Sequence, residues 1–234
     1  MYIKIFQIDT KLDKTGVKFL NLDILLHKQE AVDSTIYRKV YSGYISCDTP
    51  EHVFFVFNNE CPKGFTGHSL SVSDVIYICD SEKTEDGYYY CGSIGFEKIE
   101  FNENEAQPQL IEILLVKYME KPKRITIEDT LENLQKLVGG NIEAYGPYKD
   151  DIRLICNEEG KINGLPLNRA IYDEETHEMI EIIAGDFFIV YAPQNSDSFT
   201  SLPEELMDKY YSLFVTPEVI TVNPMTKQIL VRKK

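Results

Sequence analysis

Residues 67–74, Gly-His-Ser-Leu-Ser-Val-Ser-Asp, bring together side chains that could take part in nucleophilic catalysis. His68, Asp74 and three serines are the residue types of a catalytic triad. Triad members must converge in space, whereas successive side chains of an extended segment point to opposite faces. In an extended chain the three serines share one face and Asp74 lies on the other, and the sequence lacks a Gly-x-Ser-x-Gly nucleophile elbow.

We therefore favour a structural role for this segment over catalysis. Serine hydroxyls in a loop satisfy neighbouring backbone groups, and an aspartate caps a turn. A contact with a ligand or a partner is the second interpretation. The candidate binding residues of the segment are His68, Ser69, Ser71 and Asp74.

A second concentration of polar side chains occupies residues 157–169, Asn-Glu-Glu-Gly-Lys-Ile-Asn-Gly-Leu-Pro-Leu-Asn-Arg. Its glycines and proline indicate turns, but turn formation does not require Asn168 or Arg169. Arg169 can pair with Glu158, Glu159 or Asp186, or it can bind a phosphate or carboxylate group of a ligand. The segment is thus a structural loop, a binding surface or a pocket, with Asn157, Glu158, Asn163, Asn168 and Arg169 as candidate binding residues.

No pattern in the sequence predicts a metal site, a cofactor or a catalytic residue. The four histidines are scattered, and none of the five cysteines forms a Cys-x-x-Cys pair. The phosphate-binding patterns Gly-x-Gly-x-x-Gly and Gly-x-x-x-x-Gly-Lys-Ser/Thr are both missing. An odd number of cysteines without paired spacing fits free thiols in a reducing cytoplasm.

The formal net charge of −14 restricts the partners. Phosphate neutralisation needs a basic face, so the charge argues against direct nucleic-acid binding, and it equally disfavours an anionic membrane surface. Residues 1–106 and residues 107–234 each carry a net charge of −7, so the acidity belongs to both halves. It is either an ordinary cytoplasmic surface or an acidic face that competes for a basic partner as a DNA mimic.

Two further observations support a cytoplasmic location. No apolar run approaches the ~18 residues of a membrane-spanning helix. The first residues lack the long apolar stretch of a signal peptide and indicate a strand.

The first half of the chain has the pattern of strands with few helices. Thr49, Pro50 and Glu51 suit a helix N-cap, first position and first turn, which predicts a helix over about 50–58. The apolar run that follows also fits a buried strand, and residues 17–29 fit either a helix or a strand. We expect strands at 1–9, 36–45, 74–80 and 88–101, the last two joined as a hairpin.

Residues 102–109 are polar and acidic, which is typical of a linker, and a second set of elements follows. A short helix is capped by Asp129 or Thr130 and ends at Gly139, and Ser201 with Glu204 forms a capping box for a helix over about 202–214. The last twenty residues form one or two edge strands or stay frayed. The other strands are expected at 111–118, 124–129, 141–148, 151–157 and, bent at Gly185, 179–192.

These elements predict an α+β protein of two small domains, each a mostly antiparallel sheet with one or two short helices. The expected boundaries are 1–104 and 110–216, followed by an edge strand or tail at 217–234.

Residues 67–75, followed by Tyr88–Tyr90, Gly95 and Phe96, carry a pattern that resembles the YodL-like domain. The second half resembles the domain-of-unknown-function 3846 family, through residues 138–140, 142–143, 157–161, 163–166, 168–169 and 184–188. Together the resemblances cover most of residues 1–214. They imply a setting in phages and conjugative elements of Firmicutes and related bacteria, and for the YodL-like domain a place beside anti-restriction and DNA-processing modules. Neither resemblance implies a reaction.

The leading hypothesis is a non-enzymatic accessory protein of a phage or mobile element that binds a protein partner, such as a host-defence or DNA-processing component. The alternative is a small-ligand-binding or enzymatic module with a pocket around Asn157–Arg169, which requires Arg169 to be accessible. A third class is a structural module within a larger assembly, and the oligomeric state stays open.

Overall fold

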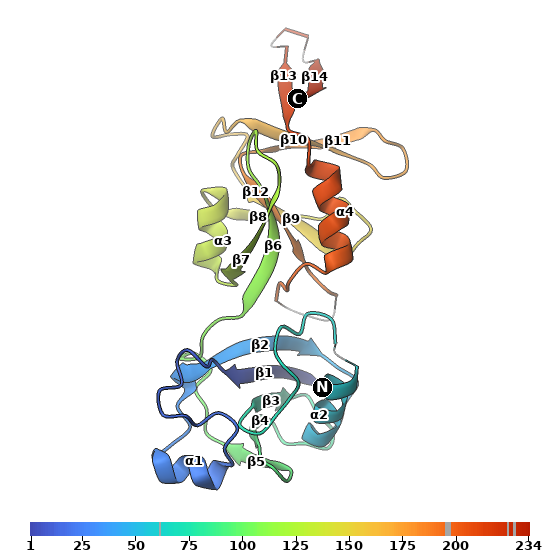
Figure 1. The fold of residues 1–234 in the computed structure, drawn as a ribbon. Helices are drawn as coiled ribbons and strands as arrows, with labels where there is room; N and C mark the ends of the chain where they lie inside the picture. Colours follow the sequence, from blue (N-terminus) through green and yellow to red (C-terminus); the bar gives the residue numbers. More distant parts are fainter. Residues whose placement is uncertain (61, 195–197, 224, 227) are drawn as a thin grey trace. The chain divides into compact units, whose positions relative to one another are not determined.

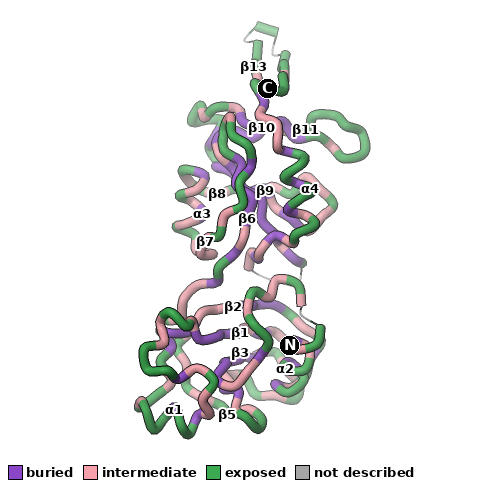
Figure 2. The backbone as a smooth tube through the Cα atoms, in the orientation of Figure 1, coloured by how far each residue is buried: buried purple, intermediate pink, exposed green. Residues whose placement is uncertain are grey.

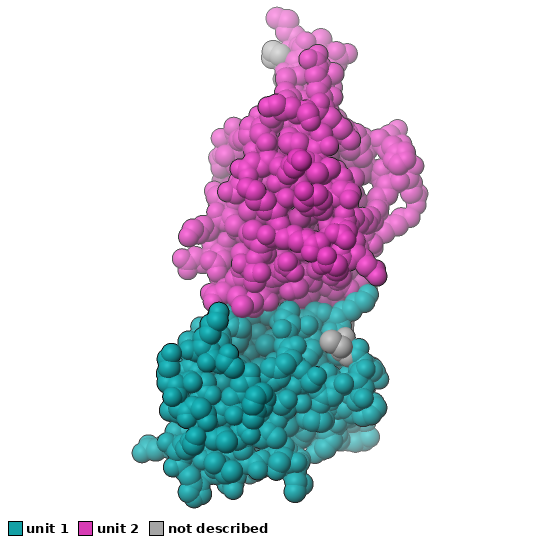
Figure 3. All heavy atoms as spheres, in the orientation of Figure 1, with its two compact units in different colours: residues 1–109, 194–198 teal, residues 110–193, 199–234 magenta. Residues whose placement is uncertain are grey.

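The computed structural model describes residues 1–60, 62–194, 198–223, 225–226 and 228–234. The chain divides into two compact units, coloured separately in Figure 3. Unit 1 comprises Met1–Gln109 and Gln194–Ser198, and unit 2 comprises Leu110–Pro193 and Phe199–Lys234. Each unit holds one five-stranded antiparallel sheet with short helices (Figure 1). The α+β class expected from the sequence is confirmed.

The sheet of unit 1 has the strand order β2-β1-β3-β4-β5, and every neighbouring pair is antiparallel. Its strands are β1 (Tyr2–Ile8), β2 (Tyr37–Tyr44), β3 (Val75–Cys79), β4 (Gly87–Cys91) and β5 (Phe96–Ile99). Its helices are α1 (Leu22–Lys28), α2 (Pro50–Asn59) and the single 3₁₀ turn η1 (Ser34–Ile36).

Both faces of this sheet are covered, which explains why its central strands are almost continuously apolar. Ile3 and Ile5 of β1 pack in the cluster that holds Phe57 of α2. Phe6 of β1 points to the other face and packs in the cluster that holds Leu25 of α1. Figure 2 shows the resulting run of buried residues along β1.

Residues 50–59, which the sequence left open as a helix or a buried strand, form helix α2. The Thr49 side chain accepts a hydrogen bond from the backbone N of His52 at 3.3 Å, and Pro50 occupies the first turn. Residues 17–29 also contain a helix, although only over Leu22–Lys28.

One expectation for the first half is wrong. The strand expected at 88–101 is two strands, β4 and β5, joined by a turn in which the Gly92 N donates to the Gly95 O at 3.0 Å. The polar segment 102–109, expected to be a linker, ends where unit 2 begins at Leu110, and it is hydrogen-bonded to unit 1. The backbone N of Gln107 donates to Tyr37 O at 2.7 Å, and the backbone O of Gln107 accepts from Lys39 N at 3.0 Å.

The sheet of unit 2 has the order β7-β6-β12-β9-β8. Helices α3 (Leu131–Val138) and α4 (Glu204–Phe214) pack in separate core clusters, α3 with Phe188 and α4 with Phe187. Since Phe187 and Phe188 are successive residues of one strand, the two helices cover opposite faces (Figure 1). The sheet strands are β6 (Leu110–Val116), β7 (Lys123–Glu128), β8 (Ile142–Tyr145), β9 (Ile152–Asn157) and β12 (Phe187–Tyr191).

Two small antiparallel sheets complete unit 2. One pairs β10 (Leu167–Tyr172) with β11 (Met179–Ala184), and the other is the hairpin of β13 (Glu218–Val222) and β14 (Ile229–Lys233). The last twenty residues, expected as one or two edge strands or a frayed tail, contain the two strands of this separate hairpin. Strand β10 was not expected, because its apolar residues follow a turn-rich segment and are interrupted by Asn168 and Arg169.

Two local expectations for unit 2 are wrong. Residues 179–192 form two strands in different sheets, because Gly185 takes a positive φ of 81° and redirects the chain. The Ser201 hydroxyl does not cap α4 but accepts from the backbone N of Glu112 at 2.9 Å, and α4 begins after Pro203 without a side-chain cap.

Within the part of the chain that the structure describes, no helix is long and apolar enough to cross a membrane.

Candidate functional site

The candidate residues of unit 1 surround the buried carboxylate of Asp74. Oδ2 of Asp74 accepts hydrogen bonds from Nε2 of Gln7 and from the backbone N of Ser71, both at 2.9 Å. Asp74 immediately precedes β3 and Gln7 lies on the neighbouring β1, so the sheet itself places the two side chains together. Asp74 has no solvent exposure.

Gln7 also forms two hydrogen bonds to the backbone of His68, in the way that the backbone of a paired strand would. Its Oε1 accepts from the backbone N of His68 at 2.9 Å, and its Nε2 donates to the backbone O of His68 at 2.7 Å. Gly67 is required at this approach, because a Cβ built there would lie 2.2 Å from Oε1 of Gln7. Sequence reasoning missed Gln7, whose only signal is an amide between the apolar Phe6 and Ile8.

Burial raises the pKa of Asp74 to about 7, against the opposing effect of its two hydrogen bonds. The second carboxylate oxygen, Oδ1, is buried without a hydrogen-bond partner among the described residues. Asp74 is therefore a buried carboxyl group with a pKa raised to about 7, and it is held in place by the Gln7 amide and the backbone N of Ser71.

The histidine and the serines do not complete a triad with Asp74. The two N–H groups of Gln7 are used by Asp74 and by the His68 O, so Nδ1 of His68 is free to donate to Ser69 O at 2.8 Å. The Ser71 hydroxyl donates to the same Ser69 O at 2.9 Å. These contacts lock the loop and leave the His68 ring and Ser69 exposed.

The expectation that the serines share one face of an extended segment is wrong. Ser73 takes a positive φ of 79° and is buried, whereas Ser69 is exposed. The Ser73 hydroxyl accepts from the backbone N of Phe19 at 2.9 Å, and its backbone O accepts from the Tyr37 hydroxyl at 2.9 Å. The segment is thus a sequence of turns that joins three parts of unit 1.

In unit 2 the most polar candidates, Asn168 and Arg169, are buried. Asn168 donates through Nδ2 to Val116 O at 3.1 Å and to Gly185 O at 2.8 Å, and its Oδ1 accepts from Nη1 of Arg169 at 2.7 Å. Asn168 therefore ties β10 to the end of β6 and to the turn before β12.

The Arg169 side chain is 1% exposed and donates only to backbone and amide oxygens. Nη2 reaches Glu120 O at 2.8 Å and Phe214 O at 3.2 Å. Phe214 ends α4, and a cation at a helix C-terminus is favourably placed against the helix dipole. Burial lowers the pKa of Arg169, and the charge of Glu218 opposes that shift.

The expected ion pairs of Arg169 with Glu158, Glu159 or Asp186 are wrong. The Asp186 carboxylate accepts instead from the backbone N of Tyr118 at 2.8 Å. Arg169 also fails the requirement of accessibility on which the pocket hypothesis for residues 157–169 depends. The reason is that strand β10 directs this side chain inward, where it donates five hydrogen bonds to backbone and amide oxygens. Only a guanidinium group has enough N–H donors to make all five.

The remaining candidates of this segment shape a turn. Nδ2 of Asn157 donates to Val138 O at 3.2 Å and to Gly139 O at 3.1 Å, which caps the C-terminus of α3. Asn163 is exposed, and its Nδ2 contacts Oε2 of Glu159 at 3.4 Å. Glu158 is exposed, and its backbone N donates to Asn141 O at 2.9 Å. The loops 64–74 and 157–169 belong to different units.

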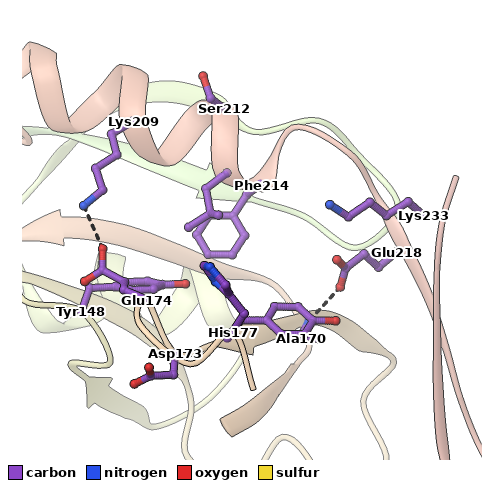
Figure 4. Close-up of a pocket in the computed structure, with 12 residues that line it drawn as sticks. Tyr148, Ala170, Asp173, Glu174, His177, Lys209, Ser212, Phe214, Glu218 and Lys233 are labelled. Atoms are coloured by element: carbon purple, nitrogen blue, oxygen red, sulfur yellow. Dashed lines mark hydrogen bonds and ion pairs between the residues drawn. The ribbon is translucent and has the colours of Figure 1, made fainter. Parts of the chain in front are cut away.

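A cavity of about 490 Å³, which we name the aromatic cavity, opens on unit 2 beside these residues. Its lining includes Tyr148, Tyr172, Leu213, Phe214 and Glu218 (Figure 4). Ala170, the residue after Arg169, also lines it and donates its backbone N–H to Oε2 of Glu218 at 2.8 Å. Sequence reasoning missed Glu218, whose one signal is an acid at the start of an otherwise apolar strand.

The charges at the mouth of the aromatic cavity are partly neutralised by each other. Lys209 donates to Oδ2 of Asp150 at 2.7 Å, which lowers the pKa of Asp150. The hydrogen bond from the backbone N of Lys149, and then that from Lys209 to Oε1 at 3.0 Å, lower the pKa of Glu174. Burial, together with the charge of Glu218, raises the pKa of Tyr148 and Tyr172, so both phenols stay protonated at neutral pH.

A second hollow, which we name the apolar groove, lies between β11 and the β13–β14 hairpin. It has a volume of about 580 Å³. Met179, Ile180 and Ile182 line it from β11, and Val222 and Ile229 line it from the hairpin, where they are directly paired. The ion pair of Lys161 and Glu181 lies at its edge.

Among the described residues there is no group of three or more histidine, cysteine or acidic side chains that could hold a metal ion. Cys47, Cys79, Cys91 and Cys156 are free thiols, and Cys61 lies outside the described residues. Burial raises the pKa of all four, which makes them poorer nucleophiles.

The structure is that of an α+β protein with two compact units. Most of the candidate polar residues make hydrogen bonds within their own unit. Comparison with protein families agrees with this division: residues 2–101 match the YodL-like domain, and residues 111–215 match a domain of unknown function, DUF3846. The chain thus joins a YodL-like domain to a DUF3846 domain. No curated protein and no solved structure matches the chain significantly.

Proposed function

We propose that this chain is a non-enzymatic accessory protein that binds a partner protein through the apolar groove of unit 2. The observation that carries the proposal is a set of large apolar side chains left exposed on both sides of one groove. Ile180 is 45% exposed on β11, and Val222 and Ile229 are 46% and 42% exposed on the hairpin. Contiguous exposed apolar surface of this kind marks interaction sites.

The backbone around the groove supports the same proposal. Among the residues that the structure describes, β14 pairs with β13 alone and β11 pairs with β10 alone. Open strand edges next to an apolar groove can accept a strand from another protein, with main-chain hydrogen bonds giving affinity and side-chain pockets giving specificity.

The charge distribution determines the chemistry of the proposed partner. Residues 219–234 contain four basic residues and no acidic residue, whereas residues 1–218 carry a net charge of −18. The hairpin beside the groove is therefore the basic end of an acidic chain. It fits a partner segment in which apolar side chains are flanked by aspartate or glutamate.

The proposed setting is a phage or a conjugative element, as the resemblance to the two families implies. In that setting the partner is a host-defence or DNA-processing component. This setting rests on what the resemblance to the two families implies, and the identity of the partner is part of the proposal.

The test compares affinity capture by three full-length proteins from cells that naturally contain the chain. The control variant is Ile94→Lys, at an apolar side chain of unit 1 that is 95% exposed. The wild type and this control should retain the same partner. The double variant Ile180→Lys/Ile229→Lys should lose it at least about tenfold, because two lysines enter the apolar groove. Circular dichroism melting checks that all three are folded.

Two results would contradict the proposal. One is a partner retained equally by the double variant, and the other is a groove-dependent partner that proves to be a second copy of this chain. Sedimentation analysis of the pure protein identifies the second case directly.

A further inference from the structure

We propose that the aromatic cavity is a binding site for an organic cation, an ammonium or guanidinium group carried on an apolar body. The proposal is independent of partner binding at the apolar groove. It rests on a buried carboxylate, on aromatic walls and on the lack of an ion pair between that carboxylate and any cationic side chain among the described residues.

Glu218 provides the negative charge. It is the first residue of β13 and is only 6% exposed, and Oε2 accepts one hydrogen bond, from the Ala170 N at 2.8 Å. Figure 4 shows the Glu218 carboxylate and its hydrogen bond to Ala170 among the residues that line the cavity. A buried carboxylate is costly unless a positive charge compensates it.

The cations of unit 2 do not provide that compensation at close range. Within the described residues no ion pair joins a lysine, arginine or histidine to Glu218. The Arg169 guanidinium is directed at carbonyl and amide oxygens, and Lys209 is held by Asp150 and Glu174. A cation of suitable size would therefore satisfy a charge that the fold leaves without a close partner.

The walls fit an organic cation better than a metal ion. Tyr148, Tyr172 and Phe214 line the cavity with aromatic rings, and Leu213 adds an aliphatic side chain. Aromatic faces attract ammonium and guanidinium groups, and this attraction strengthens when the group is desolvated. The cavity volume of about 490 Å³ is in the range of small-molecule sites.

Lys233 is an internal competitor for the same carboxylate. It lies directly opposite Glu218 in the β13–β14 pairing and also lines the cavity. Its side chain is exposed and makes no ion pair with Glu218 in the described structure. Removal of the Lys233 charge should therefore tighten cation binding, whereas an anion site would be weakened by the same change.

The experiment titrates the full-length, ¹⁵N-labelled protein with phenethylamine, and with phenethyl alcohol and benzoate as neutral and anionic probes. The readout is the amide signal of Ala170, whose N–H donates to Glu218. We expect a saturable shift with millimolar phenethylamine, at least about tenfold weaker binding of phenethyl alcohol, and no saturable shift with benzoate.

Three variants locate the site. Glu218→Gln keeps an oxygen acceptor for Ala170 but removes the charge, and should weaken phenethylamine binding at least about tenfold. Lys233→Met should strengthen binding, which keeps the proposal testable if Glu218→Gln fails to fold. Glu175→Gln, at an exposed acid that pairs with Lys149, is the matched control and should leave binding unchanged.

The proposal is overturned by any of three results: no saturable shift with phenethylamine, equal binding of benzoate or phenethyl alcohol, or weaker phenethylamine binding in Lys233→Met.

Discussion

At the residue scale, Asp74 shows how a signature that resembles a catalytic site serves as a structural anchor. The parts of a triad lie within eight residues, yet the structure directs the Asp74 carboxylate to Gln7 and to a backbone N–H. The residue types were visible in the sequence, but Gln7 is 67 positions away from Asp74. Only the pairing of β1 with β3 brings the two side chains together.

The raised pKa of Asp74 predicts a pH-dependent stability. A carboxyl group with a folded-state pKa of about 7 and an ordinary pKa near 3.8 is stabilising below pH 4. That contribution is lost as the pH rises through about 7. Between pH 5 and 8 the free energy of unfolding should therefore fall, by an amount on the order of a few kcal/mol. Asp74→Asn, which stays neutral, should remove this fall.

Urea unfolding measured by tyrosine fluorescence across this pH range provides the test. Asp48→Asn, at an exposed carboxylate that pairs with Lys83, is the control and should keep the fall. A wild type that becomes more stable from pH 5 to 8, or an Asp74→Asn variant with an unchanged slope, would show that the carboxyl is not held neutral.

The buried contacts of Arg169 predict that replacing it lowers the stability of the fold strongly, although the sequence presents Arg169 as a candidate binding residue. Arg169→Met keeps the volume but leaves the carbonyls of Glu120 and Phe214 without their donor, which should reduce stability by about 3 kcal/mol or more. Arg124→Met, at an exposed arginine that pairs with Glu204 and Asp208, should cost far less. Equal melting temperatures for the two variants would contradict the structural role of Arg169.

At the scale of the elements, the β13–β14 hairpin should be the least protected pair of strands in unit 2. It is a two-stranded sheet with exposed apolar residues on both strands, and such hairpins are marginally stable alone. Hydrogen exchange should be much faster at Ile220 and Val231 than at Ile189 in the buried β12. Similar protection at the three amides would mean that the hairpin is rigid without a partner.

The elements also show which parts of the fold are encoded locally. Helix α3 could be predicted because Thr130 caps it and Gly139 ends it in the left-handed conformation. Strand β10 could not, because its polar Asn168 and Arg169 are buried by contacts with β6, α4 and the turn before β12. A strand whose inward side chains are polar gives no alternating apolar signal.

At the scale of the whole molecule, the buried clusters predict two separately folding units. Phe6, Phe57 and Tyr90 belong to clusters inside residues 1–109, and the clusters around Phe187 and Phe188 lie inside residues 110–234. The fragment 110–234, expressed alone, should give the dispersed amide spectrum of a folded domain. A collapsed spectrum of narrow dispersion would contradict the prediction.

The distribution of function between the units was only partly visible in the sequence. The basic character of the last residues is readable, but their position beside an apolar groove requires the pairing of Val222 with Ile229 and the nearby β11. Conversely, the sequence left residues 157–169 open as a structural loop, a binding surface or a pocket. The structure uses the side chains of Asn157, Asn168 and Arg169 to join elements of unit 2.

The central claim, that a partner binds at the apolar groove, is tested most directly by site-specific photo-cross-linking in the native cell. Benzoylphenylalanine placed at Ile180 should form an adduct with one protein, which carries a segment of apolar side chains flanked by acidic residues. The same probe at Ile94 should not form this adduct. Because Ile94 is the more exposed of the two, at 95% against 45%, a collision-driven reaction would favour the control. A specific adduct at Ile180 alone is the predicted result, and equal adducts at both positions, or none at Ile180, would contradict the account.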